Sequence, residues 1–374
     1  MKQSQTEPRL VTYLHGKARR EGFPVAGNFE LTARCNFNCP MCYVHQTTEQ
    51  LRAGGKWELN GEQWLSLARQ ARDRGMVFAL LTGGEPLVRE DFFEIYGGMK
   101  ALGLMVSVNS NGSLLQGENL ARFLEDPPFR FNISLYGGSD ETYRTMCGVG
   151  AYDRVRENIR ALRAAGVNVS LNLSITPYNC GDLEQIYRDA EELDVNVKAS
   201  SYMYPPVRIN GGEYGGGNRL TAQEAAECAV RWDRLRFSPE EFAVRAEAMR
   251  LRVEEALTDC PGESEDGIRC RAGSSSFWVT WDGTMLPCGM MTKPAVHPLE
   301  TGFDAAWEAL REATAQIRTP GACAACENRE FCGVCPAVCY GETGSFQGQP
   351  HYVCEKTRAQ FALTQKIAGE RKSQ

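Results

Sequence analysis

The chain has 374 residues, of which 43% are hydrophobic and 24% charged, so it is long enough for two or three domains and has the composition of a soluble globular protein. Its 41 basic and 47 acidic side chains give a formal net charge of −6, which disfavours a nucleic-acid partner. The amino-terminal residues contain no apolar signal segment and no apolar run reaches about 18 residues, so we expect a cytoplasmic protein that does not enter a membrane. Fifteen cysteines in such a chain predict metal binding rather than disulfides.

Residues 1–27 are polar and basic and are expected to form a lead-in segment, and residues 28–33 alternate like a short strand. The loop that follows carries Cys35, Cys39 and Cys42. A [4Fe–4S] cluster normally takes four cysteine thiolates, so a triplet leaves one iron open to a non-protein ligand. The alternative is a structural zinc loop. Zinc takes four closed ligands, however, and His45 is too close to Cys42 for finger spacing.

Short apolar runs then alternate with helical patterns, which is typical of parallel β/α units. Further strands are predicted at 77–81, 104–108, 131–135, 169–175 and 195–200, and helices at about 60–74, 91–102, 117–124, 152–165 and 183–193. The first of these helices is expected to start at a capping box of Asn60 and Gln63. Six units fall short of the eight of a closed barrel.

Polar turns follow three of these strands. Gly83 and Gly84 let the backbone approach a ligand and expose amide groups, and Glu85 adds an acceptor beside them. Asn109 and Asn111 after the third strand, and Ser134 at the end of the fourth, are placed on the same rim. Taken alone, these are also ordinary turn residues.

The cysteine triplet followed by Tyr43, together with the Gly-Gly-Glu-Pro turn, resembles the radical S-adenosylmethionine (SAM) enzymes. The resemblance implies an α/β fold with a partial (β/α)6 barrel over 28–235. It also implies that SAM binds the open iron of the Cys35, Cys39 and Cys42 cluster. By the same resemblance, the amino group of SAM would be held by Gly83, Gly84 and Glu85. Its ribose and carboxylate would contact Asn109, Asn111 and Ser134. Its adenine would contact the backbone of Tyr43.

Beyond residue 200 the character of the chain changes. A glycine-rich stretch at 210–217 is followed by two helices with capping boxes at 221–224 and 238–241. We expect a helical linker at 236–259 and a small, cysteine-rich, cluster-binding domain at 260–374. The cysteine spacing there resembles the SPASM extension of some radical SAM enzymes, which carries two auxiliary [4Fe–4S] clusters.

The resemblance assigns auxiliary cluster I to Cys260, Cys270, Cys288 and Cys335, and auxiliary cluster II to Cys323, Cys326, Cys332 and Cys354. The spacing between the third and fourth cysteines of the central group is one residue shorter than usual, so Cys339 stays an alternative to Cys335. A pair of zinc ribbons is the other interpretation of the CxxC pairs.

Cys147, Cys180 and Cys228 belong to neither set. A buried thiol that acts as a small apolar side chain is the default for each of them. Cys147 and Cys180 follow strand ends and are the candidates for a catalytic thiol that donates a hydrogen atom or binds substrate. Cys228 is expected to be a core residue of a helix.

The resemblance implies an enzyme that reductively cleaves SAM to a 5′-deoxyadenosyl radical, which abstracts a hydrogen atom from the substrate. A low-potential donor such as flavodoxin or ferredoxin and an anaerobic cytoplasm are implied as well. The leading hypothesis is maturation of a ribosomally synthesised peptide by a crosslink, a thioether or an epimerisation. The alternatives are a sulfatase (formylglycine) maturase, a small-molecule dehydrogenase and a non-catalytic metal-binding scaffold.

Some features stay undetermined at this stage. In a sulfatase maturase the proposed base is an aspartate just after an auxiliary-cluster cysteine, whereas Gly289 follows Cys288 here. The 27 residues before the first strand are too few for a leader-binding domain, so recognition of a leader would fall to another chain or to residues 202–206. That run could equally be a structural cap on the sixth strand. The substrate, the bond formed and the oligomeric state do not follow from the sequence.

Overall fold

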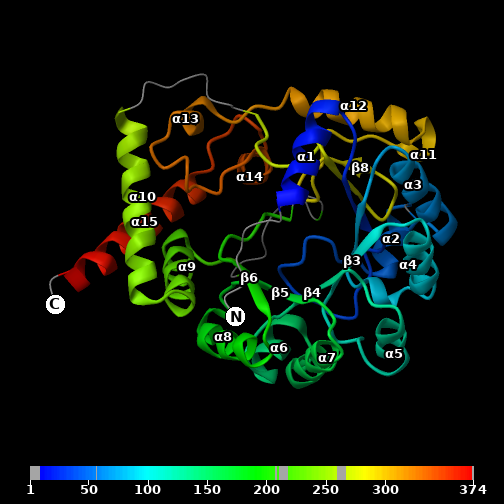
Figure 1. Ribbon diagram of the computed structural model, residues 1–374, viewed down its shortest axis with the longest axis horizontal. Coiled ribbons are helices and arrows are strands. Elements are labelled where there is room, and N and C mark those ends of the chain that lie inside the picture. Colours follow the sequence, from blue (N-terminus) through cyan, green and yellow to red (C-terminus); the bar gives the residue numbers. More distant parts are fainter. Residues whose placement is uncertain (1–8, 56, 207–208, 210–217, 259–266, 373–374) are drawn as a thin grey trace.

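The computed structural model describes residues 9–55, 57–206, 209, 218–258 and 267–372, which are arranged around one sheet with the strand order β6-β5-β4-β3-β2-β1-β7-β8 (Figure 1). The six predicted strands are β1 (Ala26–Glu30), β2 (Phe78–Thr82), β3 (Met105–Ser110), β4 (Arg130–Ser134), β5 (Val169–Ser174) and β6 (Asn196–Ser200). They pair in parallel and in chain order. The predicted α/β class with a partial (β/α)6 barrel is therefore confirmed.

The helices between these strands lie around the outside of the sheet (Figure 1). The predicted ones are α3 (Gly61–Asp73), α4 (Phe92–Ala101), α5 (Gly117–Glu125), α7 (Tyr152–Ala164) and α8 (Leu183–Glu192). The capping box at the start of α3 is present, since Asn60 and Gln63 exchange side-chain-to-backbone hydrogen bonds. Three short elements were not predicted, namely α2 (Thr48–Ala53), η1 (Pro86–Val88) and η2 (Cys180–Asp182).

A further helix that was not predicted, α6 (Asp140–Cys147), follows β4. Ser139 caps its first turn by accepting a hydrogen bond from the amide of Thr142 at 3.1 Å. Gly148 ends it in the left-handed conformation, with φ of 80°. The cysteine that was expected in a loop, Cys147, is thus the last residue of a helix.

Strands from distant parts of the chain lie side by side in the sheet, because β7 and β8 follow β1 at its edge. Where a lead-in was expected, residues Arg9–Glu21 form α1. Strand β7 (Ser276–Val279) pairs in parallel with β1, and β8 (Met285–Leu286) pairs antiparallel with β7. The ring of Phe277 contacts that of Phe29 at 5.8 Å between centroids, and the indole nitrogen of Trp307 donates to the carbonyl of Gly22 at 2.9 Å. Residues beyond 260 therefore share the core of the barrel.

The remaining helices follow β6 in the chain. They are α9 (Ala222–Arg236), α10 (Pro239–Thr258), α11 (Pro298–Thr301), α12 (Phe303–Ala315), α13 (Gly321–Ala324), α14 (Pro336–Thr343) and α15 (His351–Lys372). Helix α15 lies beside α9 and α10 (Figure 1), and Gln365 donates to the carbonyl of Ala246 at 2.7 Å. None of the helices in the described ranges is long and apolar enough to span a membrane. The predicted domain boundaries at 236 and 260 stay a prediction.

Residues 202–206 follow β6 and contact the carboxyl-terminal helices. Tyr202 donates to the carboxylate of Glu342 at 2.7 Å, and Arg219 stacks on the ring of Tyr352. The rings of Tyr202 and Tyr204 also contact each other, at 4.9 Å between centroids. These contacts correspond to the structural cap that the sequence allowed for this run.

Candidate cluster and cofactor site

The cysteine triplet lies on the loop that leaves the carboxyl end of β1, and all three thiols are half-buried. Amide groups donate to two of the sulfurs: Phe37 to Cys35 at 3.3 Å, and His45 to Cys42 at 3.2 Å. Burial raises the pKa of the Cys35 thiol to about 12, and the nearby charges of Cys42 and Cys39 add to this rise. Three thiolates gathered here therefore need a bound cation, and the chemistry of this donor set fits an iron–sulfur cluster.

The glycine turn after β2 is pressed against the cysteine loop. A side chain at Gly83 would come within 2.6 Å of the carbonyl oxygen of Thr32, and one at Gly84 within 2.3 Å of that of Arg34. The amide of Gly84 donates to the Thr32 carbonyl at 2.8 Å, and the amide of Glu85 to the Arg34 carbonyl at 2.9 Å. We expected the glycine amides to be exposed to a ligand, whereas the amide of Gly84 is used within the protein. These two hydrogen bonds extend the pairing of β1 with β2 beyond the strand ends and so hold the turn beside Cys35.

The Glu85 side chain is fully buried and is used within the protein. Its carboxylate accepts hydrogen bonds from the amide of Asn111 at 2.7 Å, the amide of Leu87 at 3.2 Å and the hydroxyl of Ser110 at 3.0 Å. Burial raises the pKa of this carboxyl group to about 7, against the lowering effect of these bonds. The carboxylate thus joins the turns after β2 and β3, and the predicted contact of Glu85 with SAM stays a prediction.

The two asparagines of the third rim turn have different surroundings. Asn111 is buried, donates to the side-chain oxygen of Asn36 at 2.8 Å and lies 3.8 Å from the sulfur of Cys35. It therefore orders the cysteine loop. Asn109 contacts the hydroxyl of Thr82 at 3.4 Å and accepts from Asn132 at 2.9 Å, so it links three neighbouring strands.

Asn132 is a candidate site residue that the sequence analysis missed. Phe131 packs on Phe123 of α5, with 4.8 Å between ring centroids. Because neighbouring strand residues point to opposite faces, Asn132 and Ser134 face away from the helices, toward the barrel interior. The side-chain oxygen of Asn132 is buried and has no hydrogen-bond partner, so it can accept one from a bound molecule. The alternation of asparagine and serine with apolar residues in β3 and β4 was the signal that could have revealed it.

The other predicted rim residues lie near the same loop. The hydroxyls of Ser134 and Tyr136 are hydrogen-bonded, and burial raises the pKa of Tyr136 well above its usual value, with further contributions from the charges of Cys39 and Cys147. Tyr136 is thus a second residue near the cluster that was not assigned a role. The ring of Tyr43 packs in a small apolar group that also contains Trp281.

The two predicted catalytic thiols have different environments. Cys147 is fully buried, accepts a backbone hydrogen bond from Asn38 at 3.1 Å and forms a side-chain hydrogen bond with Cys39. It therefore lies next to a cluster ligand. Cys180 donates weakly to the carbonyl of Pro177 at 3.6 Å, and its charge raises the pKa of Cys228, which is raised mainly by burial. The structure thus brings Cys147 to the cysteine loop and places Cys180 beside α9.

The carboxyl-terminal cysteines form two groups. The first is arranged around Tyr204, whose pKa is raised by burial and then by the charges of Cys335, Cys288 and Cys270. Amide groups of Ala272 and Met290 contact the sulfurs of Cys270 and Cys288, both at 3.5 Å. Cys260, the predicted fourth member, lies outside the described residues.

The second group lines one small cavity of about 30 Å³ and contains Cys323, Cys326, Cys332 and Cys354. Burial raises the pKa of Cys323, and the charges of the other three raise it further. Thr357 and Gln349 donate to two of the sulfurs, at 3.5 and 3.6 Å. Cys339 is fully buried between the groups, near Cys323 and Cys335.

No three His, Cys, Asp or Glu side chains in the described part of the chain converge as ligands of a single metal ion. In a [4Fe–4S] cluster each thiolate binds a different iron, so its ligands are arranged around a cube. The spacing and chemistry of the three cysteine groups fit such clusters.

Comparison with known proteins identifies the amino-terminal part of the chain. Residues 29–190 match the Radical SAM superfamily. The chain is 26% identical over 364 residues to a protein named AdoMet-dependent heme synthase from Oleidesulfovibrio alaskensis, and the match covers 92% of this chain and 89% of the relative. It is 27% identical over 320 residues to the PqqA peptide cyclase of Streptomyces rochei, covering 84% and 82% respectively.

Among solved structures, the fold is similar to that of native anSMEcpe with bound AdoMet and Cp18Cys peptide. The TM-score is 0.65, the identity is 16%, and the match covers 93% of this chain and 99% of the other. At this identity the likeness concerns the fold alone. The cysteine loop at the carboxyl end of β1, the buried turn after β2 and the family match agree: the chain is an enzyme whose residues 29–190 form a radical SAM domain.

Proposed function

We propose that this chain modifies a peptide substrate and that it holds three [4Fe–4S] clusters, one at Cys35, Cys39 and Cys42 and two in the carboxyl-terminal part. The observation that carries the proposal is the polar barrel interior beside the cysteine loop, where the unpartnered oxygen of Asn132 is available to a bound molecule. When bound, the first cluster and SAM supply the reductive cleavage that yields the 5′-deoxyadenosyl radical, which abstracts a hydrogen atom from the substrate.

The chain's own residues have positioning roles in this proposal. Glu85 and Asn111 hold the two turns beside Cys35, and the amides of Phe37 and His45 stabilise the thiolate forms of the loop cysteines. Gly83, Gly84, Tyr43 and Ser134 are proposed to contact SAM, the glycines through their backbone carbonyls. The half-buried Tyr136 packs against Phe37 of the cysteine loop, with 6.1 Å between the ring centroids.

Two auxiliary clusters are supported by the two separate cysteine groups. The first would take Cys260, Cys270, Cys288 and Cys335. Cys335 is included because its charge, like those of Cys270 and Cys288, raises the pKa of Tyr204. The second would take Cys323, Cys326, Cys332 and Cys354, which line one cavity. With four thiolates each, they would accept or relay electrons rather than bind substrate.

A peptide substrate is supported by the relative named PqqA peptide cyclase and by the fold shared with a peptide-bound protein. The sulfatase-maturase alternative loses support at position 289. A side chain there would come within 2.7 Å of the Trp278 ring, whose nitrogen donates to Glu30 at 3.0 Å. Because the indole is held in this place, an aspartate after Cys288 does not fit.

A second candidate is a small-molecule substrate such as a heme precursor. The relative named AdoMet-dependent heme synthase matches 92% of this chain, which is more than the peptide cyclase matches. The genes next to this one separate the two candidates. A short peptide gene favours the peptide, and genes of tetrapyrrole synthesis favour the heme precursor.

The radical chemistry is tested by anaerobic reconstitution. The brown protein should contain about twelve irons per chain and convert SAM and dithionite into 5′-deoxyadenosine. Cys39→Ala should abolish this product and keep about eight irons, which are the two auxiliary clusters. A colourless zinc protein, or full cleavage by Cys39→Ala, would refute the proposal.

A further inference from the structure

The strands of the barrel carry two positive charges and one negative charge, and the negative charge lies beside the cluster loop. The charged residues of β1 to β6 are Glu30, Arg130 and Lys198. Glu30 is the last residue of β1 and accepts a hydrogen bond from the indole of Trp278 at 3.0 Å. Burial raises the pKa of Cys42, and the charge of Glu30 raises it further. The carboxylate is therefore next to the cysteine loop, whereas the two cations are on β4 and β6.

The register of the strands places Lys198 on the interior face of the barrel. Lys198 of β6 pairs with Asn172 of β5, and Asn172 pairs with Ser134 of β4. Residues that pair in neighbouring strands point to the same face of a sheet. Because Ser134 faces the barrel interior, Lys198 faces it as well. The lysine thus lies in the same row of side chains as a proposed SAM contact.

Arg130 faces the same interior from β4. It precedes Asn132 by two residues, so both side chains point to one face of the strand. Partial burial lowers the pKa of Lys198, and the charge of Arg130 lowers it further. The two cations are therefore close enough to repel each other.

Neither cation is neutralised by a residue that the structure describes. Within the described ranges, no ion pair and no side-chain hydrogen bond involves Arg130 or Lys198. Arg130 lies over the ring of Phe129, with 5.8 Å to the ring centroid, and this contact leaves its charge in place. Like charges held together without a counter-ion destabilise the folded chain, and an anionic ligand removes that cost.

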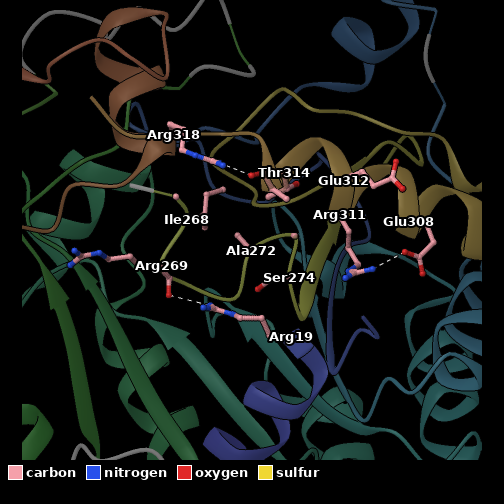
Figure 2. Close-up of a pocket in the computed structure, with 13 residues that line it drawn as sticks. Arg19, Ile268, Arg269, Ala272, Ser274, Glu308, Arg311, Glu312, Thr314 and Arg318 are labelled. Atoms are coloured by element: carbon pink, nitrogen blue, oxygen red, sulfur yellow. Dashed lines mark hydrogen bonds and ion pairs between the residues drawn. The ribbon is translucent and has the colours of Figure 1, made fainter. Parts of the chain in front are cut away.

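A cavity of about 530 Å³ beside α1 and α12 shows the contrasting case (Figure 2). It is also lined by arginines, but Arg311 pairs with Glu308 at 2.7 Å and Arg269 pairs with Glu330 at 3.4 Å. The arginines of that cavity are thus partly neutralised within the protein. The pair in the barrel lacks such partners and is the better candidate for an anion site.

We propose that Lys198 and Arg130 bind a carboxylate of the peptide substrate, namely the side chain of an aspartate or glutamate near the residue that is modified. Carboxylates are the side-chain anions of an unmodified peptide at neutral pH. The unpartnered oxygen of Asn132, on the same face, accepts a backbone N–H of this peptide. This inference rests on the proposed function, because it names a feature of the peptide substrate.

The test measures peptide binding to the full chain, loaded with its clusters and saturated with SAM, by anaerobic calorimetry. The probes are the acetylated and amidated pentapeptide Gly-Gly-Glu-Gly-Gly and its counterpart with glutamine in place of glutamate. Wild type should bind the glutamate peptide at least about tenfold more tightly, because a charge-assisted hydrogen bond is lost with glutamine. Lys198→Met and Arg130→Met should each reduce this preference to about threefold or less. Lys198→Arg keeps the charge and should retain the preference.

The matched control is Lys366→Met on the exposed side of α15, which should keep the preference of the wild type. The Kd of SAM should stay within about twofold of wild type in every variant, since the cations bind substrate and not the cofactor. Equal iron content shows that each variant has folded and loaded its clusters. A tenfold rise in the Kd of SAM in Lys198→Met would assign the site to the carboxylate of SAM and overturn the proposal.

The remaining outcomes separate this inference from the proposed function. Equal affinity of the wild type for the two peptides, no binding of either, or a preference that both methionine variants keep would overturn the carboxylate site for a peptide. A glutarate titration gives a further arm. Glutarate binding that both methionine variants lose, without a preference between the peptides, would overturn the peptide source and indicate a small carboxylic acid. Absence of dithionite-supported SAM cleavage in the wild type would instead refute the proposed function, whatever the peptide preference.

Discussion

The buried carboxyl group of Glu85 predicts an unusual dependence of stability on pH. Burial raises its pKa in the folded chain from 4.5 to about 7. The folded state then holds the proton more tightly than the unfolded state, so the stabilisation is complete below pH 4.5 and is lost as the pH rises to 7. The shift corresponds to about 3 kcal/mol, of which about 2.5 kcal/mol is lost between pH 5 and pH 8.

The perturbation is Glu85→Gln, which keeps the shape of the side chain and removes its titration. Urea unfolding of the metal-free chain, followed by tryptophan fluorescence, gives the free energy of unfolding at pH 5 and pH 8. Between these values the wild type should lose about 2.5 kcal/mol more than Glu85→Gln. Glu157→Gln on the exposed face of α7 is the control and should follow the wild type. An equal pH response of wild type and Glu85→Gln would refute the reasoning.

Four further substitutions test the cluster surroundings and the core. Cys147→Ala should make the reduction potential of the SAM-binding cluster more negative by roughly 20–60 mV. The hydrogen bond between the Cys147 thiol and the sulfur of Cys39 favours the reduced cluster, and the substitution removes it. An EPR-monitored redox titration measures the potential. Cys335→Ala should lose about four irons in an iron assay, whereas Cys339→Ala should keep all of them. Arg89→Met should lower the free energy of unfolding, measured with urea, by about 3–5 kcal/mol. Arg89 is buried, and its partner Asp91, at 2.7 Å, would lose its counter-charge.

Each of these expectations has a clear contrary result. An unchanged potential in Cys147→Ala means that its thiol does not act on the cluster. Loss of iron in Cys339→Ala and not in Cys335→Ala would exchange the two assignments. A cost below about 1 kcal/mol for Arg89→Met would show that water replaces its hydrogen bonds.

The sequence predicted the local parts of the fold well. The strand–helix alternation from β1 to β6, and the capping boxes that begin α3 and α9, follow from side chains within a few residues of one another. Helices α1, α2 and α6 were missed, as were the helices from α11 to α15. The basic, polar composition before β1 concealed the apolar face of α1, and α6 has only 8 residues.

Strand β7 and its pairing with β1 could not be predicted from the sequence. Its four residues, Ser276–Val279, are too few for a periodic pattern, and its partner β1 lies about 250 residues earlier in the chain. Pairing at that separation depends on the folded core, in which Phe277 packs between Phe29 and Trp307. The expected carboxyl-terminal domain therefore shares its first strands with the barrel.

By itself, the sequence determined the chemistry available to this protein: the spacing of Cys35, Cys39 and Cys42 and the glycine turn indicated the radical SAM family. Only the tertiary structure decided which groups face the site. It buried the carboxylate of Glu85, brought Cys147 to Cys39 and left the oxygen of Asn132 without a partner. The physical reason is that motif spacing follows from the covalent chain, whereas burial and hydrogen-bond partners depend on elements that meet only when the barrel closes around them.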